Sequence, residues 1–562
     1  MSKTSTNRRR SVKNTVGRDI DALFAKWDCN GSPGAIIAVI RAGKVIHQKG
    51  YGLANIEDNV PFTTDTVLRL GSTTKHMCAT CILVLENRKL LSLEDDIRKY
   101  VPEMPVFADV ITLRHLLTMT SGLWDGLNLL LFAGLDTAAP LSRQQQLRLY
   151  CRQRELMFRP GEDCTYSNTN YSLLSLVIER ISGLSLGEFM QAELFEPLGM
   201  KHTRLVPEMK EKIEHKARGY LPRLEGGFEA GYMMVELDGN GGVDSTISDM
   251  LRWFDNYRDD RCFGPDYRQR LEAPSHLNDG RLLEYRLGMT VSDYRGTRVV
   301  RHSGGMPGYL CDFVFYPEPD LGIILFANVM APELLELPER IADLLLEDEL
   351  LLPRESTFVD TADKHASELL GVYASGSHGL VLQLADENGK LVCYLLGELN
   401  PLYERNGWLE SRKNPLAVRP ADPGLGRAGG LQLRQGCQEL IDLEPVDDPL
   451  RYLQAMPADF ETFTGHYWLE TLDEIHRVSL QDGRLIVSIG SPVRDLVWSE
   501  LAPVTGDLFV APVDGEPSCT NVTVQFLRTG NGQVNGLTTS INRCRHVFLK
   551  KLPDDRMCHE PG

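Results

Sequence analysis

The stretch Val67-Leu68-Arg69-Leu70-Gly71-Ser72-Thr73-Thr74-Lys75 decides the fold. Its apolar start predicts a short strand, Gly71 ends that strand, and a helix opens at Ser72. Lys75 follows Ser72 by three residues, so both side chains lie on one face of the first helical turn. A hydroxyl beside an amine at a helix N-terminus can act as a nucleophile with a neighbouring base. In isolation, the simpler interpretation is that Ser72 caps the helix and Lys75 is solvated.

A second polar motif, Tyr166-Ser167-Asn168, follows Pro160-Gly161. The Pro-Gly pair predicts a loop, and a loop at the tip of a helical insertion can hang over the edge of a sheet. Tyr166 could relay protons if cations lower its pKa, and Asn168 could hydrogen-bond Lys75 and a substrate amide. Alone, the motif fits equally well a turn with a packing tyrosine.

A third motif, His302-Ser303-Gly304-Gly305, follows a strand predicted over residues 297–301. Small residues at Gly304 and Gly305 let a substrate backbone lie along the strand edge. The N–H groups of Gly305 and Ser72 are a candidate pair to hold an oxyanion. His302 could donate to Tyr166 or to a substrate carbonyl. Alone, the motif is a glycine-rich bend with an incidental histidine, since patterns this short recur by chance roughly once in such a chain.

The surrounding pattern predicts strands, then helices, then strands. A hairpin is expected over residues 35–47, with helices over 72–90, 113–120 and 173–181 that stop near Gly183 and Gly199. Strands are expected again at 298–300, 313–315 and 322–326, followed by a helix over 333–347. This order predicts an α+β domain with a helical insertion in a sheet.

The chain has 562 residues, 42% hydrophobic and 24% charged, with a net charge of −17. The length suggests about three or four domains, and the charge argues against nucleic acid or an anionic membrane as the partner. No signal-peptide or membrane-length apolar stretch is visible, and the 12 cysteines are scattered. Cys78 and Cys81 lie in an apolar helical run, which favours buried thiols over a metal pair. We therefore expect a cytoplasmic protein with reduced cysteines.

The last third of the chain contains an internal repeat. Gly371-Val372-Tyr373 is echoed by Gly465-His466-Tyr467, and the turn at Gly389 by the turn at Gly483. Both anchors share an offset of about 94 residues, which chance hairpin turns would rarely keep. The pattern predicts two tandem antiparallel β-barrels.

Ser-x-x-Lys, Tyr-x-Asn and His-x-Gly in this order resemble the penicillin-recognising serine hydrolases: class C β-lactamases, DD-carboxypeptidases and related esterases. The segments 111–123, 195–200 and 241–246 are also typical of that family. The resemblance covers about residues 20–348. The histidine of the third motif, where class C enzymes usually carry lysine, and the two β-barrels resemble the D-aminopeptidase branch.

The resemblance implies Ser72, Lys75 and Tyr166 as catalytic residues, with Asn168, His302, Gly304 and Gly305 holding substrate. It implies no metal, no cofactor, a small peptide or amide substrate, and a homodimer as the form to test. In that branch a loop of the last barrel reaches the active site and helps to select substrates with a free amine. The matching loop here is 514–521, in which Asp514 and Glu516 could attract an ammonium group. Asn240 stands where the branch carries an acid, which would weaken one contact to that amine.

The domains expected are a flexible N-terminal tail (1–19), a β-lactamase-like catalytic domain (20–348), a linker (349–365) and two lipocalin-like barrels (366–452 and 456–553). The activity expected is a serine aminopeptidase that releases N-terminal D-amino acids through an acyl-enzyme. Alternatives are an esterase, amidase, β-lactamase or DD-peptidase of the same fold, or a binding protein on a hydrolase scaffold.

Overall fold

The computed structural model describes residues 16–553 with several gaps. The gaps are 30, 133–139, 210, 224–225, 348, 351–358, 360, 362–363, 377, 396–397, 406, 412–415, 423–427, 436–439, 447–459, 491–494, 513–520 and 542–543. The described residues fall into two compact units. The first lies within Met1–Ser121, Thr137–Arg148 and Asn168–Arg354, and the second within Gly122–Asp136, Leu149–Ser167 and Glu355–Gly562.

The first unit is built on a six-stranded antiparallel sheet in the order β10-β11-β12-β13-β1-β2. Its strands are β1 (Ala35–Arg41), β2 (Lys44–Tyr51), β10 (Thr290–Tyr294), β11 (Thr297–Met306), β12 (Tyr309–Tyr316) and β13 (Leu321–Ala327). The predicted hairpin is present, and its turn residues Ala42 and Gly43 both have positive φ. The first and last parts of the unit therefore meet in one sheet, because β1 pairs along its length with β13.

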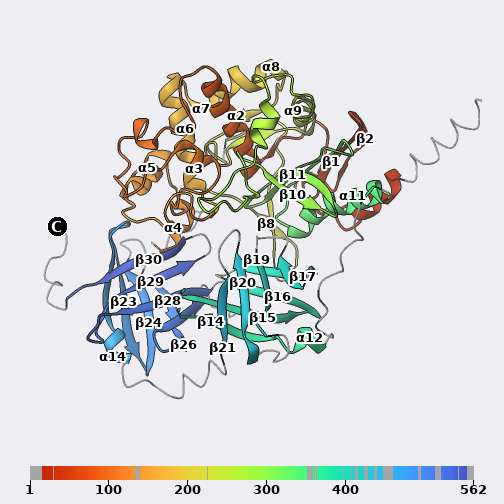
Figure 1. Ribbon diagram of the computed structural model, residues 1–562. Helices are drawn as coiled ribbons and strands as arrows, with labels where there is room; N and C mark the ends of the chain where they lie inside the picture. Colours follow the sequence, from red (N-terminus) through yellow and green to blue (C-terminus); the bar gives the residue numbers. More distant parts are fainter. Residues whose placement is uncertain are drawn as a thin grey trace, which may run out of the picture. The chain divides into compact units, whose positions relative to one another are not determined.

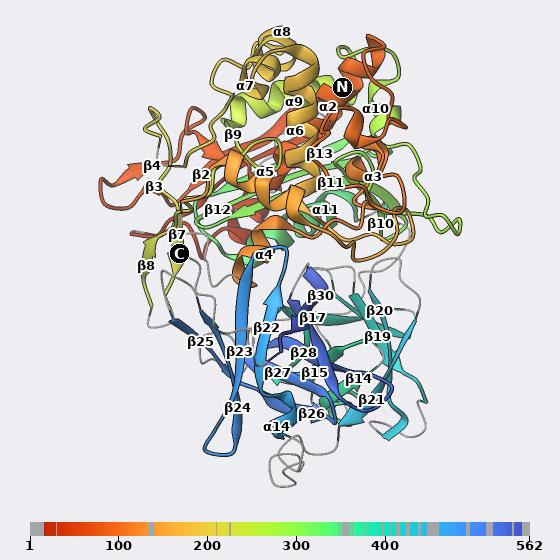
Figure 2. The ribbon, with the colours of Figure 1, turned by 90° about the vertical axis from the view of Figure 1, so that its left-hand side faces the viewer.

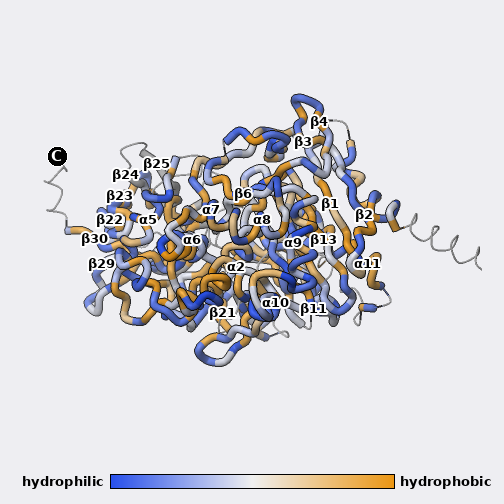
Figure 3. Tube along the Cα trace, turned by 90° about the horizontal axis from the view of Figure 1, so that it is seen from above, coloured by the Kyte–Doolittle hydropathy of each residue, from blue (hydrophilic) through white to orange (hydrophobic). Residues whose placement is uncertain are grey.

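Helices cover both faces of this sheet (Figure 1). On one face, Ile37 and Val39 of β1 pack in a core with Ile341 of α11 (Leu337–Leu346) and with Ile20, from a helical stretch at residues 16–23. That stretch begins within the predicted tail 1–19. On the other face, Phe313 of β12 meets aromatic side chains of α2 (Thr74–Asn87) and α9 (Ile247–Asp259). The apolar run of α2 is visible in the hydropathy colouring of Figure 3, and its residues Cys78 and Cys81 are buried free thiols, as predicted.

The remaining elements of the first unit are short. The helices are α3 (Leu113–Leu117), α6 (Asn168–Ser182), α7 (Leu186–Met190), α8 (Glu196–Leu198) and α10 (Tyr267–Leu271), with 3-10 turns at Gly71–Thr73, Ile97–Lys99 and Pro332–Glu336 and a π-helical turn at Gln191–Phe195. The strands are β3 (Leu53–Asn55), β4 (Val60–Pro61), β5 (Leu68–Arg69), β6 (Arg204–Leu205), β7 (Tyr220–Pro222), β8 (Phe228–Ala230) and β9 (Val243–Ser245). Of the two other helices in this part of the sequence, α4 (Gly126–Phe132) belongs to the second unit, and α5 (Arg143–Arg152) begins in the first unit and ends in the second. Gly183 and Gly199 end helices with positive φ, as expected.

The second unit carries two barrel-like sheets, so the predicted fold class is confirmed. The first sheet is a closed barrel of eight strands: β14 (Gly371–Ser375), β15 (Leu380–Glu387), β16 (Lys390–Leu395), β17 (Glu398–Arg405), β18 (Trp408–Ser411), β19 (Leu416–Pro420), β20 (Leu431–Gln435) and β21 (Ile441–Val446). The second is a nine-stranded antiparallel sheet: β22 (Gly465–Leu469), β23 (Glu474–Gln481), β24 (Arg484–Gly490), β25 (Asp495–Glu500), β26 (Ala502–Thr505), β27 (Leu508–Pro512), β28 (Asn521–Arg528), β29 (Val534–Ile541) and β30 (Cys544–Lys551). Figure 2 shows the strands of this sheet.

The internal repeat is present at the level of side chains. Tyr373 and Tyr467 are both fully buried, and each donates its hydroxyl hydrogen to a backbone carbonyl four residues earlier, at 2.7 and 2.6 Å. The strands β15 and β23 begin and end at the predicted offset. Short helices precede the two tyrosine strands, α12 (Lys364–Ser367) and α14 (Phe460–Phe463).

Most of the predicted linker 349–365 lies outside the described residues, so the domain boundaries on either side of it stay predictions. Within the described part of the chain, no helix combines the length and the apolar character needed to cross a membrane.

Candidate active site

Ser72 lies where the backbone changes from strand to helix. Residues Gly71–Thr73 form a single 3-10 turn between β5 and α2. Gly71 has a φ of +55°, a conformation that glycine adopts without steric cost. The Ser72 side chain is half-buried. The predicted strand–glycine–helix arrangement is therefore present, although β5 is only two residues long.

Lys75 brings three oxygen atoms together. Its Nζ lies 3.1 Å from Ser72 Oγ, 2.8 Å from Asn168 Oδ1 and 2.6 Å from the backbone oxygen of Asn240. The Tyr171 ring lies 5.7 Å from the same nitrogen. Lys75 itself is fully buried. A buried ammonium is costly unless hydrogen bonds replace its water shell, and these oxygens supply that replacement.

This geometry suits both protonation states of the amine. As an ammonium, Lys75 donates to all three oxygens. As a neutral amine, it can donate to Asn168 Oδ1 and Asn240 O, neither of which has a hydrogen to give, and accept from the Ser72 hydroxyl. A proton can thus pass between Ser72 and Lys75 without either of the other two bonds breaking. A serine hydroxyl needs such a neighbouring base to become a nucleophile at neutral pH.

Asn168 and Tyr166 lie at the start of α6. Asn168 is the first residue of that helix, whereas the sequence placed it in a loop. Helix α6 packs against α2, which brings Asn168 to Lys75. Tyr166 is half-buried in the loop two residues earlier, as predicted. Its part in catalysis stays a prediction.

Strand β11 presents an edge beside Ser72. Strand β10 pairs with β11 only as far as Arg301, so the ladder on that side ends before His302. The following residues of β11 lie against the 3-10 turn: a Cβ built on Gly304 would come within 2.9 Å of Ser72 N, and one built on Gly71 within 3.1 Å of Gly305 N. Thr73 Oγ1 also donates to the backbone oxygen of His302, at 3.1 Å. The backbones carrying the expected oxyanion pair are therefore adjacent.

The His302 side chain has two hydrogen-bond partners that the sequence did not predict. Its Nδ1 lies 2.7 Å from the backbone oxygen of Ser303, which can only accept, so Nδ1 carries the hydrogen. Its Nε2 lies 3.0 Å from the hydroxyl of Tyr285 and accepts from it. Burial, with a smaller contribution from the Lys75 charge, lowers the pKa of His302 to about 3. These two contacts hold the neutral ring against the strand. The predicted role of His302 toward Tyr166 or a substrate carbonyl stays a prediction. The sequence offered no signal for Tyr285.

The Asn240 side chain also points away from its expected role. Its Nδ2 donates to Ser172 Oγ at 2.9 Å, and the residue is 3% exposed. Its backbone oxygen, rather than its amide, faces Lys75. Asn240 therefore serves the site through its main chain, and a contact between its side chain and a substrate amine is not what this conformation provides.

A buried charge cluster supports the strand before Ser72. Arg69 of β5 forms a fully buried ion pair with Asp244 of β9, the residue it opposes in the ladder. Lys216 Nζ reaches the same carboxylate at 2.6 Å. Leu70 N continues the pairing to Val243 O at 2.9 Å. None of these charges stood out in the sequence, because their partners are more than 25 residues apart along the chain.

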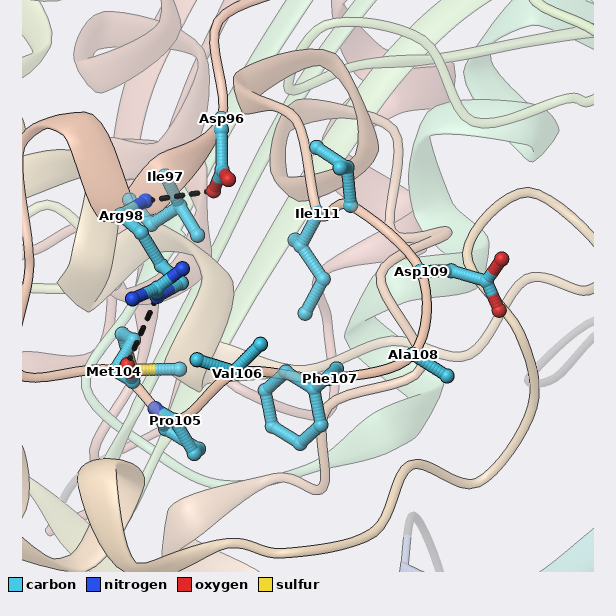
Figure 4. A pocket seen from close by; sticks show the side chains of 11 residues that line it. Asp96, Ile97, Arg98, Met104, Pro105, Val106, Phe107, Ala108, Asp109 and Ile111 are labelled. Atoms are coloured by element: carbon cyan, nitrogen blue, oxygen red, sulfur yellow. Dashed lines mark hydrogen bonds between the residues drawn. The ribbon is translucent and has the colours of Figure 1, made fainter.

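A shallow hollow elsewhere in the first unit has a different character (Figure 4). It is lined by residues 96–98 and 104–111, including Val106 and Phe107. Its polar groups pair with each other: Arg98 N donates to Asp96 Oδ1 at 2.8 Å and Arg98 Nε to Met104 O at 3.3 Å. It contains none of the candidate residues. The loop 514–521 with Asp514 and Glu516 lies almost entirely outside the described residues.

A helix-start serine, a buried lysine three residues on and a glycine-lined strand edge together define a serine hydrolase. Comparison with known proteins names the family. The Beta-lactamase family model matches residues 20–346, and the chain belongs to that family.

Several known proteins are similar to this chain. It is 28% identical over 411 residues to "Penicillin-binding protein 4*" of Bacillus subtilis (strain 168), covering 67% of this chain and 86% of that protein. It is 28% identical over 537 residues to a "D-aminopeptidase" of Brucella anthropi, covering 92% of this chain and 95% of that protein. Among solved structures, the octameric penicillin-binding protein homologue from Pyrococcus abyssi matches 77% of this chain and 99% of its own, with a TM-score of 0.53 and 23% identity, which shows the shared fold.

Replacing Gly304 by alanine is expected to disable the site. The new Cβ would come within 1.9 Å of Leu70 O and 2.9 Å of Ser72 N, so the 3-10 turn must move. We expect hydrolysis to fall at least about 100-fold, since misplacement by about 1 Å can cost that much. The matched control is Gly305→Ala, whose Cβ meets only side-chain atoms, at 3.4 and 3.5 Å. Equal kcat/KM for the two variants would contradict this geometry.

The buried neutral His302 should make stability depend on pH. The unfolded chain takes up a proton on this residue below its ordinary pKa of about 6.5, whereas the folded protein resists until about pH 3. Stability is therefore complete above about pH 6.5 and falls on acidification, by about 1.4 kcal/mol per pH unit for this group. Urea unfolding at pH 6.5 and 5.5 should show an extra loss of about 1 kcal/mol in the wild type and not in His302→Gln, because half of the unfolded-state histidine is already protonated at pH 6.5. The same pH dependence in both proteins would refute a buried neutral ring.

Proposed function

We propose that this protein is a serine aminopeptidase that releases N-terminal D-amino acids from small peptides, amides or esters through an acyl-enzyme. The observation that carries the chemistry is the contact of Lys75 Nζ with Ser72 Oγ, 3.1 Å, held by two further oxygens. This contact puts a base within hydrogen-bond distance of the serine hydroxyl, from which it can take the proton directly.

In the proposed reaction, Ser72 Oγ attacks the substrate carbonyl and its proton passes to Lys75. The N–H groups of Ser72 and Gly305 hold the oxyanion of the tetrahedral intermediate. Lys75 and Tyr166 then deliver the proton to the leaving amine, which departs and leaves an ester on Ser72. The same groups activate a water molecule that hydrolyses this ester. Asn168 orients Lys75, and the β11 edge at Gly304 receives the substrate backbone.

The D-amino acid specificity is supported by relatives. A protein named "D-aminopeptidase" from Brucella anthropi aligns over 92% of this chain, which includes the repeated β-sheets as well as the hydrolase domain. The third motif, residues 302–305, begins with histidine, which resembles the D-aminopeptidase branch. Recognition of the free amine is assigned by the same resemblance to Asp514 and Glu516.

A different substrate on the same machinery is the alternative. The similarity to "Penicillin-binding protein 4*" over 67% of this chain favours a β-lactam such as penicillin as the ligand. A DD-peptidase, an esterase or an amidase would use the same serine. The Asn240 amide is bound to Ser172, so it does not replace the acid that the D-aminopeptidase branch carries at this position to contact the substrate amine. Substrate tests are therefore chosen to separate these options.

The free amine of the substrate is the property to test. D-Alanine p-nitroanilide should be hydrolysed at least about 100-fold faster, by kcat/KM, than its N-acetylated form, because capping removes the charge of the amine and adds bulk. L-Alanine p-nitroanilide serves as the matched control for the D preference. Equal rates on the free and acetylated substrates would rule out an aminopeptidase and leave an esterase or endo-acting hydrolase.

The acyl-enzyme should be detectable by mass. Mixing the protein with an activated D-alanyl ester at low pH, followed by rapid quench and intact-mass measurement, should show one added acyl group on the wild type. Ser72→Ala should show none, while Ser303→Ala, which changes a hydroxyl on the same strand edge, should still be acylated. An adduct on Ser72→Ala would place the nucleophile elsewhere, and no adduct on the wild type would favour a binding protein on a hydrolase scaffold.

A further inference from the structure

A buried carboxylate lies behind the carbonyl that contacts Lys75. Asp238 is 4% exposed, and its hydrogen bonds stabilise the turn that follows it. Its backbone oxygen accepts from Gly241 N and Gly242 N, at 3.1 and 2.8 Å, and its Oδ1 accepts from Asn240 N at 3.1 Å. A carboxylate that accepts from the N–H two residues later locks a turn of this kind. The locked turn leaves Asn240 O facing Lys75 Nζ at 2.6 Å.

A second set of contacts fixes the same turn from the side of helix α6. Ser172 Oγ donates to Asp238 Oδ1 at 3.1 Å and accepts from Asn240 Nδ2 at 2.9 Å. Gly239 N donates to Ser175 Oγ at 2.9 Å. A Cβ on Gly239 would come within 2.6 Å of Cys78 Sγ, so the turn lies directly on α2 as well. The turn therefore has little room to shift against Lys75.

The charge of Asp238 is balanced by one arginine. Arg143 Nε lies 3.5 Å from Asp238 Oδ2, and its two terminal nitrogens lie 2.9 and 3.1 Å from the carboxylate oxygens of Glu179. The groups facing Asp238 are thus Arg143 from α5, Glu179 and Ser172 from α6, and Cys78 from α2. Lys75 is linked to it through Asn240, whose N–H donates to Asp238 Oδ1 and whose carbonyl oxygen accepts from Lys75 Nζ. Burial raises the pKa of Asp238, and the charge of Arg143 and the hydrogen bonds from Asn240 N and Ser172 Oγ oppose that rise and favour the ionised form. The field of a buried carboxylate acts strongly on nearby charges because water is excluded.

We propose that Asp238 is a positioning residue for Lys75: it holds the Asn240 carbonyl against the amine, and its negative charge stabilises the ammonium form. This inference rests on the proposed function, since it assigns a role relative to the proposed base. The carbonyl oxygen of Asn240 accepts one N–H of Lys75. This fixes the orientation of the amine, so that its other positions face Ser72 and Asn168. The carboxylate sets how readily the amine gives up its proton to the leaving group.

The decisive variant is Asp238→Asn in the full-length protein, assayed with D-alanine p-nitroanilide from pH 6 to 10. The asparagine keeps the size and the Oδ1 acceptor but removes the charge. We expect kcat to fall about 10- to 100-fold with KM changed less than about threefold, the range expected for a group that acts on proton transfer. Because the ammonium loses a stabilising charge, the limb of the kcat/KM profile that reports Lys75 should move to lower pH by about 0.5 to 1 unit.

Asp312→Asn is the matched control. Asp312 is also a buried carboxylate paired with an arginine, at 2.9 and 2.5 Å from Arg301, and burial raises its pKa as it raises that of Asp238. It lies opposite Ser303 in the β11–β12 ladder, on the face that carries Glu339 of α11, whereas His302 and Gly304 point to the other face. This variant should lose stability comparably and keep the wild-type pH profile.

Ser172→Ala separates position from charge, and it keeps the inference testable if Asp238→Asn does not fold. It removes the bridging hydroxyl and retains the carboxylate, so kcat should fall about three- to tenfold with no displacement of the pH profile. Unchanged kcat in both Asp238→Asn and Ser172→Ala would overturn the inference, as would an equal pH displacement in Asp312→Asn. If Ser72→Ala and Lys75→Ala lose activity while Asp238→Asn and Ser172→Ala keep it, this inference alone is wrong. If Ser72→Ala keeps full activity, the proposed function is wrong.

Discussion

A fully buried lysine amine is the constraint around which the first unit is arranged. Lys75 cannot be charged inside the protein unless oxygens replace its water, and three of them meet its Nζ within 3.1 Å. They come from the helix start at Ser72, the helix start at Asn168 and the turn at Asn240. Satisfying one cation thus holds together three segments that span about 170 residues of sequence, and the same contacts place a base on a hydroxyl.

The scaffold keeps these segments in place by burying charge pairs around them. Arg69 and Asp244 join the strand before Ser72 to the strand after the Asn240 turn, and Asp238 with Arg143 joins that turn to the helical insertion. Such pairs are expensive to bury, so they contribute less to net stability than to selecting one arrangement. At Gly304 the arrangement depends on steric fit, because only a residue without a Cβ lets β11 approach the Ser72 turn this closely. The positions of the site residues therefore depend on buried ion pairs and on glycine at a close backbone contact, rather than on any single strong bond.

Local chemistry made part of this predictable. The hairpin at Ala42-Gly43, the helix after Gly71 and the stops at Gly183 and Gly199 follow from backbone preferences, and the structure has all of them. The 94-residue repeat was readable because both copies need the same positive-φ turn and the same buried tyrosine. The side-chain partners of His302 and Asn240 were not predicted, for one shared reason. A motif names a side chain but not its direction, and burial turned His302 to Tyr285 and Asn240 to Ser172.

By itself, the sequence determined the class of the protein: the order of the elements, the spacing of Ser72 and Lys75 on one helical turn, and the glycine edge at Gly304. These depend on neighbours within a few residues, for which backbone geometry is decisive. Only the tertiary structure decided what surrounds Lys75. The Asn240 carbonyl meets Lys75 from 165 residues away, and Asp238 meets Ser172 from 66 residues away. The neutral state of His302 arises mainly from burial. Their effects depend on distance and on the exclusion of water, which exist only once the chain has folded.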